Sequence, residues 1–298
     1  MSSHVLSLFV ITLAAATVNG ALGYGFSSIT VPLALLFLTN RILNPALVLI
    51  EVALNAWVLW VNRDALSDTW RRVLPIVIGL APGVAAGTLI VSQLSPEWLK
   101  LATYLMLLPL ILLQAAGYRR PIRSERSLGL AFGGGLGVLY SVTTVSGPPL
   151  AVMLNNQGFA KKQFRAALGF VRLAESTMTA CAYAYVGLFT PASMGLLPQI
   201  LPAVAIGVPL GTLVIRHVRP ETFRRICMSF DAWVVAFGIS TLLRDLHLVE
   251  SRAAFLVLIA VALLDAWLLY RFFSAPGGAA LAAGASSDRN SEEYFRHS

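Results

Sequence analysis

The chain has 298 residues, of which 57% are hydrophobic and only 12% are charged, and its mean hydropathy is +0.75. Soluble domains carry about 25% charged residues, so this composition excludes an ordinary soluble protein and predicts a multi-pass protein of the lipid bilayer. The net charge of +8 lies in short segments between apolar runs, which leaves no folded soluble domain to bind nucleic acid.

The first apolar stretch, at about residues 6–38, is interrupted by the sequence NGALGYGFSSITV at 19–31. Its glycines permit backbone conformations that end a helix, so we expect a broken helical hairpin. Non-helical backbone at membrane depth is tolerated only where it is packed in protein or lines a wet cavity, and the break therefore predicts a site. The candidate substrate ligands in it are Gly23, Gly25, Ser27, Ser28 and Thr30, with Asn19 as a further polar contact.

Three apolar runs follow near 44–61, 73–91 and 99–115, each close to the roughly 20 residues that a membrane-spanning helix needs. Glu51 and Asn55 lie inside the first run. A charge inside a span costs about 2.5–3.5 kcal/mol on insertion scales and therefore suggests function. We interpret Glu51 as a candidate for proton coupling and Asn55 as a candidate polar contact.

The second interrupted stretch, 128–157, repeats the first pattern. It contains a glycine-rich run, a cluster of hydroxyls, and the pair Pro148-Pro149, which cannot donate the hydrogen bonds that a continuing helix needs. The candidate ligands of this second hairpin are Ser141, Thr143, Thr144, Ser146 and Gly147, with Asn155 as a further polar contact. In both hairpins the alternative is that the small residues only let helices pack closely.

Apolar runs near 164–186, 194–215, 223–243 and 253–273 complete the membrane part. A polar tail follows, which we expect to be disordered because it cannot bury an apolar core. The two cysteines lie inside apolar runs and the four histidines lie near the expected ends or loops. We therefore expect neither a metal site nor a cofactor.

Charged residues inside two of these runs are candidates for function. Arg172 is a candidate anion ligand, and Glu175, three residues later on the same face, is a candidate for proton coupling. The alternative is a self-neutralised ion pair that holds the two halves of the chain together. Asp231 is a further candidate for proton coupling, unless it partners a neighbouring arginine.

Two segments of the chain repeat. Residues 20–31 align with 134–145 at an offset of 114, and 83–97 matches 207–221 at seven of fifteen positions at an offset of 124. Lys and Arg are enriched in cytoplasmic loops, and this rule places the corresponding loops of the two halves on opposite sides of the membrane, with Arg41 as the exception. Paired interrupted segments in two such halves indicate a transporter's binding site.

The predicted fold is an all-α polytopic membrane protein of two inverted-topology repeats. Each repeat is a broken helical hairpin plus three transmembrane helices, and one extra C-terminal helix follows. The predicted parts are a first repeat at 1–117, a basic cytoplasmic linker at 118–127, a second repeat at 128–245, the extra helix at 246–273 and a disordered polar tail at 274–298.

With the motifs Val31-Pro32-Leu33, Ser146-Gly147-Pro148-Pro149-Leu150 and the repeated G-V-x-x-G-T-L, the chain resembles the sulfite exporter TauE/SafE family, also known as the 4-toluene sulfonate uptake permease family. The resemblance implies a carrier of small sulfur-containing anions, such as sulfite or organosulfonates, in the bacterial cytoplasmic membrane. Most members have more glycine in the first motif. Here Tyr24, Phe26, Ser27 and Ser28 stand there, which predicts a bulkier and more hydroxylated pocket.

We predict a secondary transporter that works by alternating access between the two halves, as an exporter or with proton coupling. Its partners are a small anion and the bilayer, and a homo-oligomer is left open. An anion channel of the same architecture and a carrier of a non-sulfur organic anion are the alternatives. A membrane-embedded enzyme is least favoured, because the short, arginine-rich loops offer no cluster of catalytic His, Asp or Cys residues.

Overall fold

The computed structural model describes residues 3–115, 125–156, 159, 161–214, 220–249 and 252–274. Every regular element within these ranges is a helix, which confirms the predicted all-α class. The elements are α1 (Ser3–Leu22), α2 (Phe26–Ala34), α3 (Asn40–Val61), η1 (Arg63–Ala65), α4 (Trp70–Gln93), α5 (Pro96–Ala115), α6 (Glu125–Thr143), α7 (Gly147–Asn156), α8 (Lys161–Tyr185), α9 (Pro191–Met194), α10 (Leu197–Val214), α11 (Pro220–Asp245), η2 (Arg252–Phe255) and α12 (Leu256–Ser274). Most of the predicted linker and all but the first residue of the predicted tail lie outside the described residues.

Five helical segments are long and apolar enough to cross a membrane within the described ranges. They are Asn40–Val61, Trp70–Gln93, Pro191–Val214, Arg225–Asp245 and Arg252–Arg271. Shorter apolar helices cover Val5–Ala21 and Leu128–Thr143, in the two stretches where the sequence predicted interrupted hairpins. The chain is thus an integral membrane protein in which spanning helices are combined with broken ones.

Both interrupted stretches are broken helices. The first break lies between α1 and α2, where Gly23 and Gly25 have φ angles of 82° and 105°. The second lies between α6 and α7, where Thr144 has a φ of 54°. The helices after the breaks have nine and ten residues, so each reaches about 13–15 Å, roughly half the hydrocarbon thickness of a bilayer.

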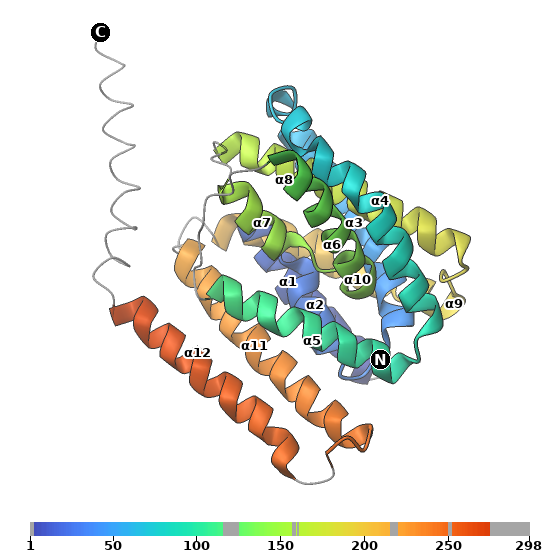
Figure 1. Ribbon diagram of the computed structural model, residues 1–298, viewed down its shortest axis with the longest axis vertical. Helices are drawn as coiled ribbons and strands as arrows, with labels where there is room; N and C mark the ends of the chain where they lie inside the picture. Colours follow the sequence, from blue (N-terminus) through green and yellow to red (C-terminus); the bar gives the residue numbers. More distant parts are fainter. Residues whose placement is uncertain are drawn as a thin grey trace.

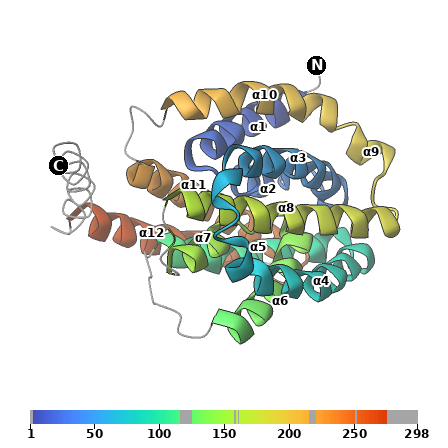
Figure 2. The same cartoon turned by 90° about the horizontal axis from the view of Figure 1, so that it is seen from above.

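The helices of the two predicted repeats pack crosswise. α1 lies against α10 and α4 against α6, so the first helix of each half contacts a helix of the other half. Figure 2 shows these two pairs on opposite sides of the molecule, with α3 and α8 between them. In Figure 1, α5 and α11 lie side by side and α12 lies beyond α11. This exchange of partners is compatible with the predicted inverted repeat.

The repeated G-V-x-x-G-T-L segment supplies the close contacts of the two outer pairs. It lies on α4 and on α10. A Cβ added to Gly83 of α4 would collide with the backbone carbonyl of Gly134 in α6, and one added to Gly211 of α10 would collide with that of Thr17 in α1. Glycine is therefore needed where the backbones touch, and much of the glycine pattern serves helix packing.

Arg41, the exception to the loop-charge pattern, has a local role. Its Nε donates to the carbonyl of Val91 at 3.0 Å, and one terminal nitrogen donates to Ser92 at 2.7 Å and to Leu94 at 2.8 Å. These are carbonyls at the carboxyl end of α4, which the helix itself leaves without donors. The positive charge also complements the negative end of the helix dipole, so capping explains its position.

Candidate functional site

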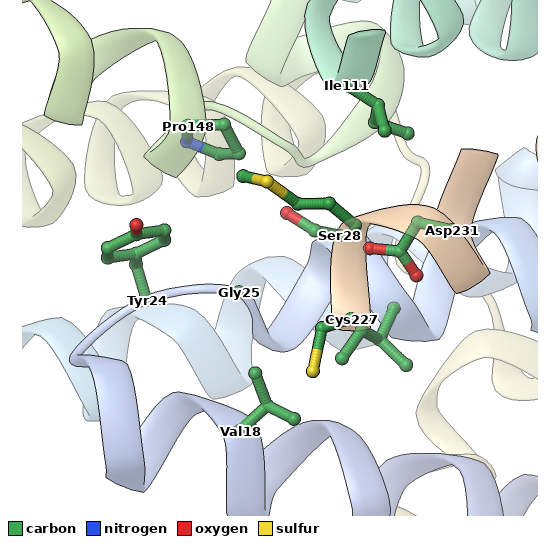
Figure 3. A pocket seen from close by; sticks show the side chains of 10 residues that line it. Val18, Tyr24, Gly25, Ser28, Ile111, Pro148, Cys227 and Asp231 are labelled. Atoms are coloured by element: carbon green, nitrogen blue, oxygen red, sulfur yellow. The ribbon is translucent and has the colours of Figure 1, made fainter. Parts of the chain in front are cut away.

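The two helix breaks meet inside the protein. A Cβ built on Gly147, the first residue of α7, would lie 3.1 Å from the Cβ of Tyr24 in the first break. Tyr24 and Pro148 also line one cavity together with Gly25 and Ser28, and Figure 3 shows Tyr24 and Pro148 on the same side of it. Residues more than 120 positions apart in the chain thus meet at one place.

Glu51 of α3 is the most heavily hydrogen-bonded side chain of this centre. The hydroxyl of Ser27 in α2 donates to its Oε1 at 2.7 Å, and the hydroxyl of Tyr140 in α6 donates to its Oε2 at 2.8 Å. A terminal nitrogen of Arg172 in α8 lies 2.9 Å from Oε1. The carboxylate is only 1% exposed, so three other helices compensate a charge that would otherwise be costly to bury.

The second hairpin makes the matching contact. The hydroxyl of Ser146, at the start of α7, donates to Oε2 of Glu175 in α8. Glu175 is fully buried, and its Oε1 has no hydrogen-bond partner among the described residues. In each half, therefore, a serine at the helix break donates to a carboxyl group of the next long helix, Glu51 in one case and Glu175 in the other.

Arg172 is the cation of this network. It is 4% exposed, it pairs with Glu51, and its Nε has no partner among the described residues. The pair joins α3 to α8. It is an ion pair between the two halves of the chain, which is the alternative to anion binding that the sequence left open for Arg172. Asn55 Nδ2 donates a long hydrogen bond of 3.4 Å to the Arg172 carbonyl and so adds a weak contact between α3 and α8. One arginine thus lies beside two buried acids. We call the six residues that these contacts connect the central network: Ser27, Glu51, Tyr140, Ser146, Arg172 and Glu175.

Other hydroxyls of the second hairpin satisfy the backbone. Thr143 Oγ1 accepts from the amide of Val145 at 3.0 Å, and Thr144 Oγ1 donates to the carbonyl of Thr143 at 2.7 Å. The Ser141 hydroxyl lies between α6, α4 and α8, 3.4 Å from the Val84 carbonyl. These three side chains hold the break together within the protein, as backbone at membrane depth requires.

Side chains that the sequence reasoning missed support the same break. Asn44 Nδ2 donates to the carbonyl of Val142 at 2.8 Å, and the hydroxyl of Tyr183 donates to the carbonyl of Ser141. Tyr140, which binds Glu51, was missed as well. The available signal was the polar group itself, since an asparagine inside an apolar span must find a partner.

The two hairpins differ in the donors that they offer. Helix geometry leaves the amides of Phe26, Ser27 and Ser28, at the amino end of α2, without acceptors in their own helix. In α7 the second and third residues are prolines, which have no N–H, so Gly147 alone contributes an amide to that first turn. The amino end of α2 therefore offers more amide donors than the amino end of α7.

The remaining candidates lie around this centre. Gly25 and Ser28 line the cavity, as does Asp231 of α11. Gly23 donates its amide to the carbonyl of Asn19 at 2.7 Å and so helps to close the first break. Thr30 is buried, and its hydroxyl has no partner among the described residues. The side chain of Asn155 lies outside the described residues. No group of three potential metal ligands occurs within the described ranges.

A family model and a curated relative that match the chain point to the same family. The family model described as "Sulfite exporter TauE/SafE" matches residues 8–239, which include both breaks and the central network. The chain is also 30% identical over 181 residues to a protein of Cupriavidus necator named "Probable sulfite/organosulfonate exporter TauE", and the match covers 58% of this chain and 68% of that protein. No solved structure matches the chain significantly.

Proposed function

Since the chain belongs to the sulfite exporter TauE/SafE family of membrane transporters, we propose that it is a secondary carrier of a small sulfur-containing anion in the bacterial cytoplasmic membrane. The observation that carries the proposal is the meeting of the two broken helices at Tyr24 and Gly147, beside the buried central network. Discontinuous helices that meet inside the membrane form the binding sites of many secondary transporters.

The anion binds between the breaks. The amino end of α2 supplies amide donors and the positive end of a helix dipole, and the hydroxyl of Ser28 faces the same cavity. Arg172 is the cation of the central network, and its charge is matched by Glu51. An anion that draws on Arg172 must therefore weaken this ion pair.

Transport proceeds by alternating access. The cavity between the breaks is small, with a volume of about 30 Å³, and it is lined by residues of both breaks, α5 and α11. A small cavity between packed helices favours a carrier whose helices move over a wide, open channel. The ion pair between Arg172 and Glu51, at the contact of α3 with α8, is the polar link that such a movement would rearrange.

Counterflow in proteoliposomes tests this function. Vesicles loaded with unlabelled sulfite or isethionate should transiently accumulate the same radiolabelled anion, and acetate should not compete. Transient accumulation requires a carrier that exchanges its substrate, so conductive flux without counterflow would indicate the channel alternative. Counterflow of acetate without that of either sulfur anion would overturn the proposed substrate class.

A further inference from the structure

Asp231 is a buried acid that the central network does not include. It lies near the middle of α11, its side chain is 4% exposed, and its Oδ1 has no hydrogen-bond partner among the described residues. Figure 3 shows its carboxyl group in the cavity between the helix breaks, with Ser28 on the neighbouring α2. An unpartnered carboxyl group therefore faces the place where we propose that the anion binds.

The cavity offers this carboxyl group almost no compensation. Four side chains of its lining are aliphatic or thioether groups, namely Val18, Ile29, Ile111 and Met228. Its polar side chains besides Asp231 are the hydroxyls of Tyr24 and Ser28 and the thiol of Cys227, and the described lining contains no cationic side chain. A carboxylate isolated in such surroundings is very costly, whereas the neutral acid is tolerated.

The other described charged side chains of α11 and of the helices packed against it are engaged elsewhere. Arg225, six residues before Asp231, lies 3.4 Å from Asp265 of α12. The charges of α5, Glu97 and Lys100, lie near Asp245, which is about 20 Å further along α11. The sequence of α2 contains no charged residue. A proton is thus the counter-charge that fits, since a metal cation would need several oxygen ligands.

The amino end of α2 lines the same cavity through Gly25 and Ser28. An anion bound to the first amides of α2 would lie beside Asp231. If Asp231 is ionised, the two negative charges repel each other in surroundings of low dielectric constant. If Asp231 is protonated, the repulsion is absent and the acid is one more hydrogen-bond donor to the anion.

We propose that Asp231 is a proton-binding site that must be loaded before an anion binds at the amino end of α2, so that the protein moves a proton and an anion together. This inference rests on the proposed carrier function and adds the coupling ion and its site. A monovalent sulfonate transported with one proton transfers no net charge. Transport is then driven by the anion and pH gradients and does not respond to the membrane potential.

Wild-type protein in liposomes provides the first test. Isethionate is used as the probe because it stays fully ionised between pH 5 and pH 9, so a pH effect belongs to the protein. An inward isethionate gradient should acidify the lumen, as reported by a trapped pH-sensitive dye. Uptake should fall by about tenfold per pH unit on the alkaline side of the Asp231 titration. A potential imposed with potassium and valinomycin should not change the rate.

Variants then assign the effect to Asp231. Asp231→Asn removes the titrating group, so lumen acidification should be lost and the isethionate counterflow that remains should be independent of pH. Asp231→Glu keeps a titrating group and should keep the acidification. Asp245→Asn, an exposed position on the same helix, is the matched control and should behave as wild type.

The outcomes separate the inference from the proposed function. Isethionate transport by the wild type without lumen acidification overturns the inference and leaves the carrier function intact. A requirement for sodium, or loss of acidification in Glu175→Gln with its retention in Asp231→Asn, also overturns it. If the wild type transports neither isethionate nor sulfite, both the proposed function and this inference fail.

Discussion

The ion pair between Arg172 and Glu51 allows a quantitative test of the central network. Removing one partner of a buried pair costs about 3–5 kcal/mol, because the other charge stays buried without compensation. Arg172→Gln leaves two acids, Glu51 and Glu175, in a site where the fractional exposure of each is 1% or less. We therefore expect this substitution to lower the free energy of unfolding by about 3–5 kcal/mol.

Glu51→Gln should cost less. The remaining Arg172 keeps Glu175 as a nearby acid, and the new amide oxygen can still accept a hydrogen bond from Ser27 or from Tyr140, while the other hydroxyl can rotate to accept from the amide nitrogen. We expect a loss of about 1–3 kcal/mol, the range for imperfectly satisfied buried polar groups. The double variant should be more stable than Arg172→Gln alone, because it removes both members of the pair.

The assay is unfolding by SDS in mixed detergent micelles, followed by the fluorescence of the six tryptophans. Arg63→Gln is the matched control, because Arg63 lies 3.9 Å from Asp64 on the surface, where the two side chains are 58% and 98% exposed. Exposed pairs contribute about 0–1 kcal/mol. If Arg172→Gln is no less stable than Arg63→Gln, or if Glu51→Gln is the more damaging single change, the electrostatic reasoning is wrong.

Three further predictions use the same unfolding assay. Gly83→Ala should destabilise the protein by several kcal/mol, because its Cβ would collide with the Gly134 carbonyl. Gly135→Ala has open space around it and should be neutral or slightly stabilising, so equal effects of the two changes would disprove the packing argument. Tyr104→Phe should cost about 1 kcal/mol, because it removes the 2.9 Å hydrogen bond to the carbonyl of Pro32 in α2, and an unchanged midpoint would show that the bond contributes nothing. Asn44→Ala should cost about 1–3 kcal/mol by leaving the Val142 carbonyl without its 2.8 Å donor; wild-type stability would mean that the second break does not depend on it.

Sequence pattern located the unusual backbone well. The glycines and prolines that cannot continue a helix predicted both breaks, and the structure places them at Gly23 to Gly25 and at Thr144 to Ser146. The roles of the hydroxyls were less predictable. Ser27 and Ser146 bind carboxyl groups, whereas Thr143 and Thr144 satisfy backbone, although all four are small hydroxyl residues beside a break. The difference depends on which helix passes each side chain.

The partner of the buried charge of Arg172 could not be predicted from the sequence either. Its place inside an apolar span marked it as important, because charges in lipid are costly. The sequence left open whether it binds an anion or an acid of the protein. In the folded chain Glu51, 121 residues away, lies within 2.9 Å. Tyr140, a third partner of the same carboxylate system, could not be distinguished from a packing residue before the fold was known.

The sequence by itself determined the membrane class, the helical elements, the two breaks and the buried charges, because hydropathy, proline and glycine act over short stretches of chain. Only the tertiary structure decided that the breaks meet, that each break serine donates to a carboxyl group, and that Asp231 faces the cavity without a partner. These facts depend on contacts between helices far apart in the chain. No local pattern encodes which side chain a packed neighbour will meet.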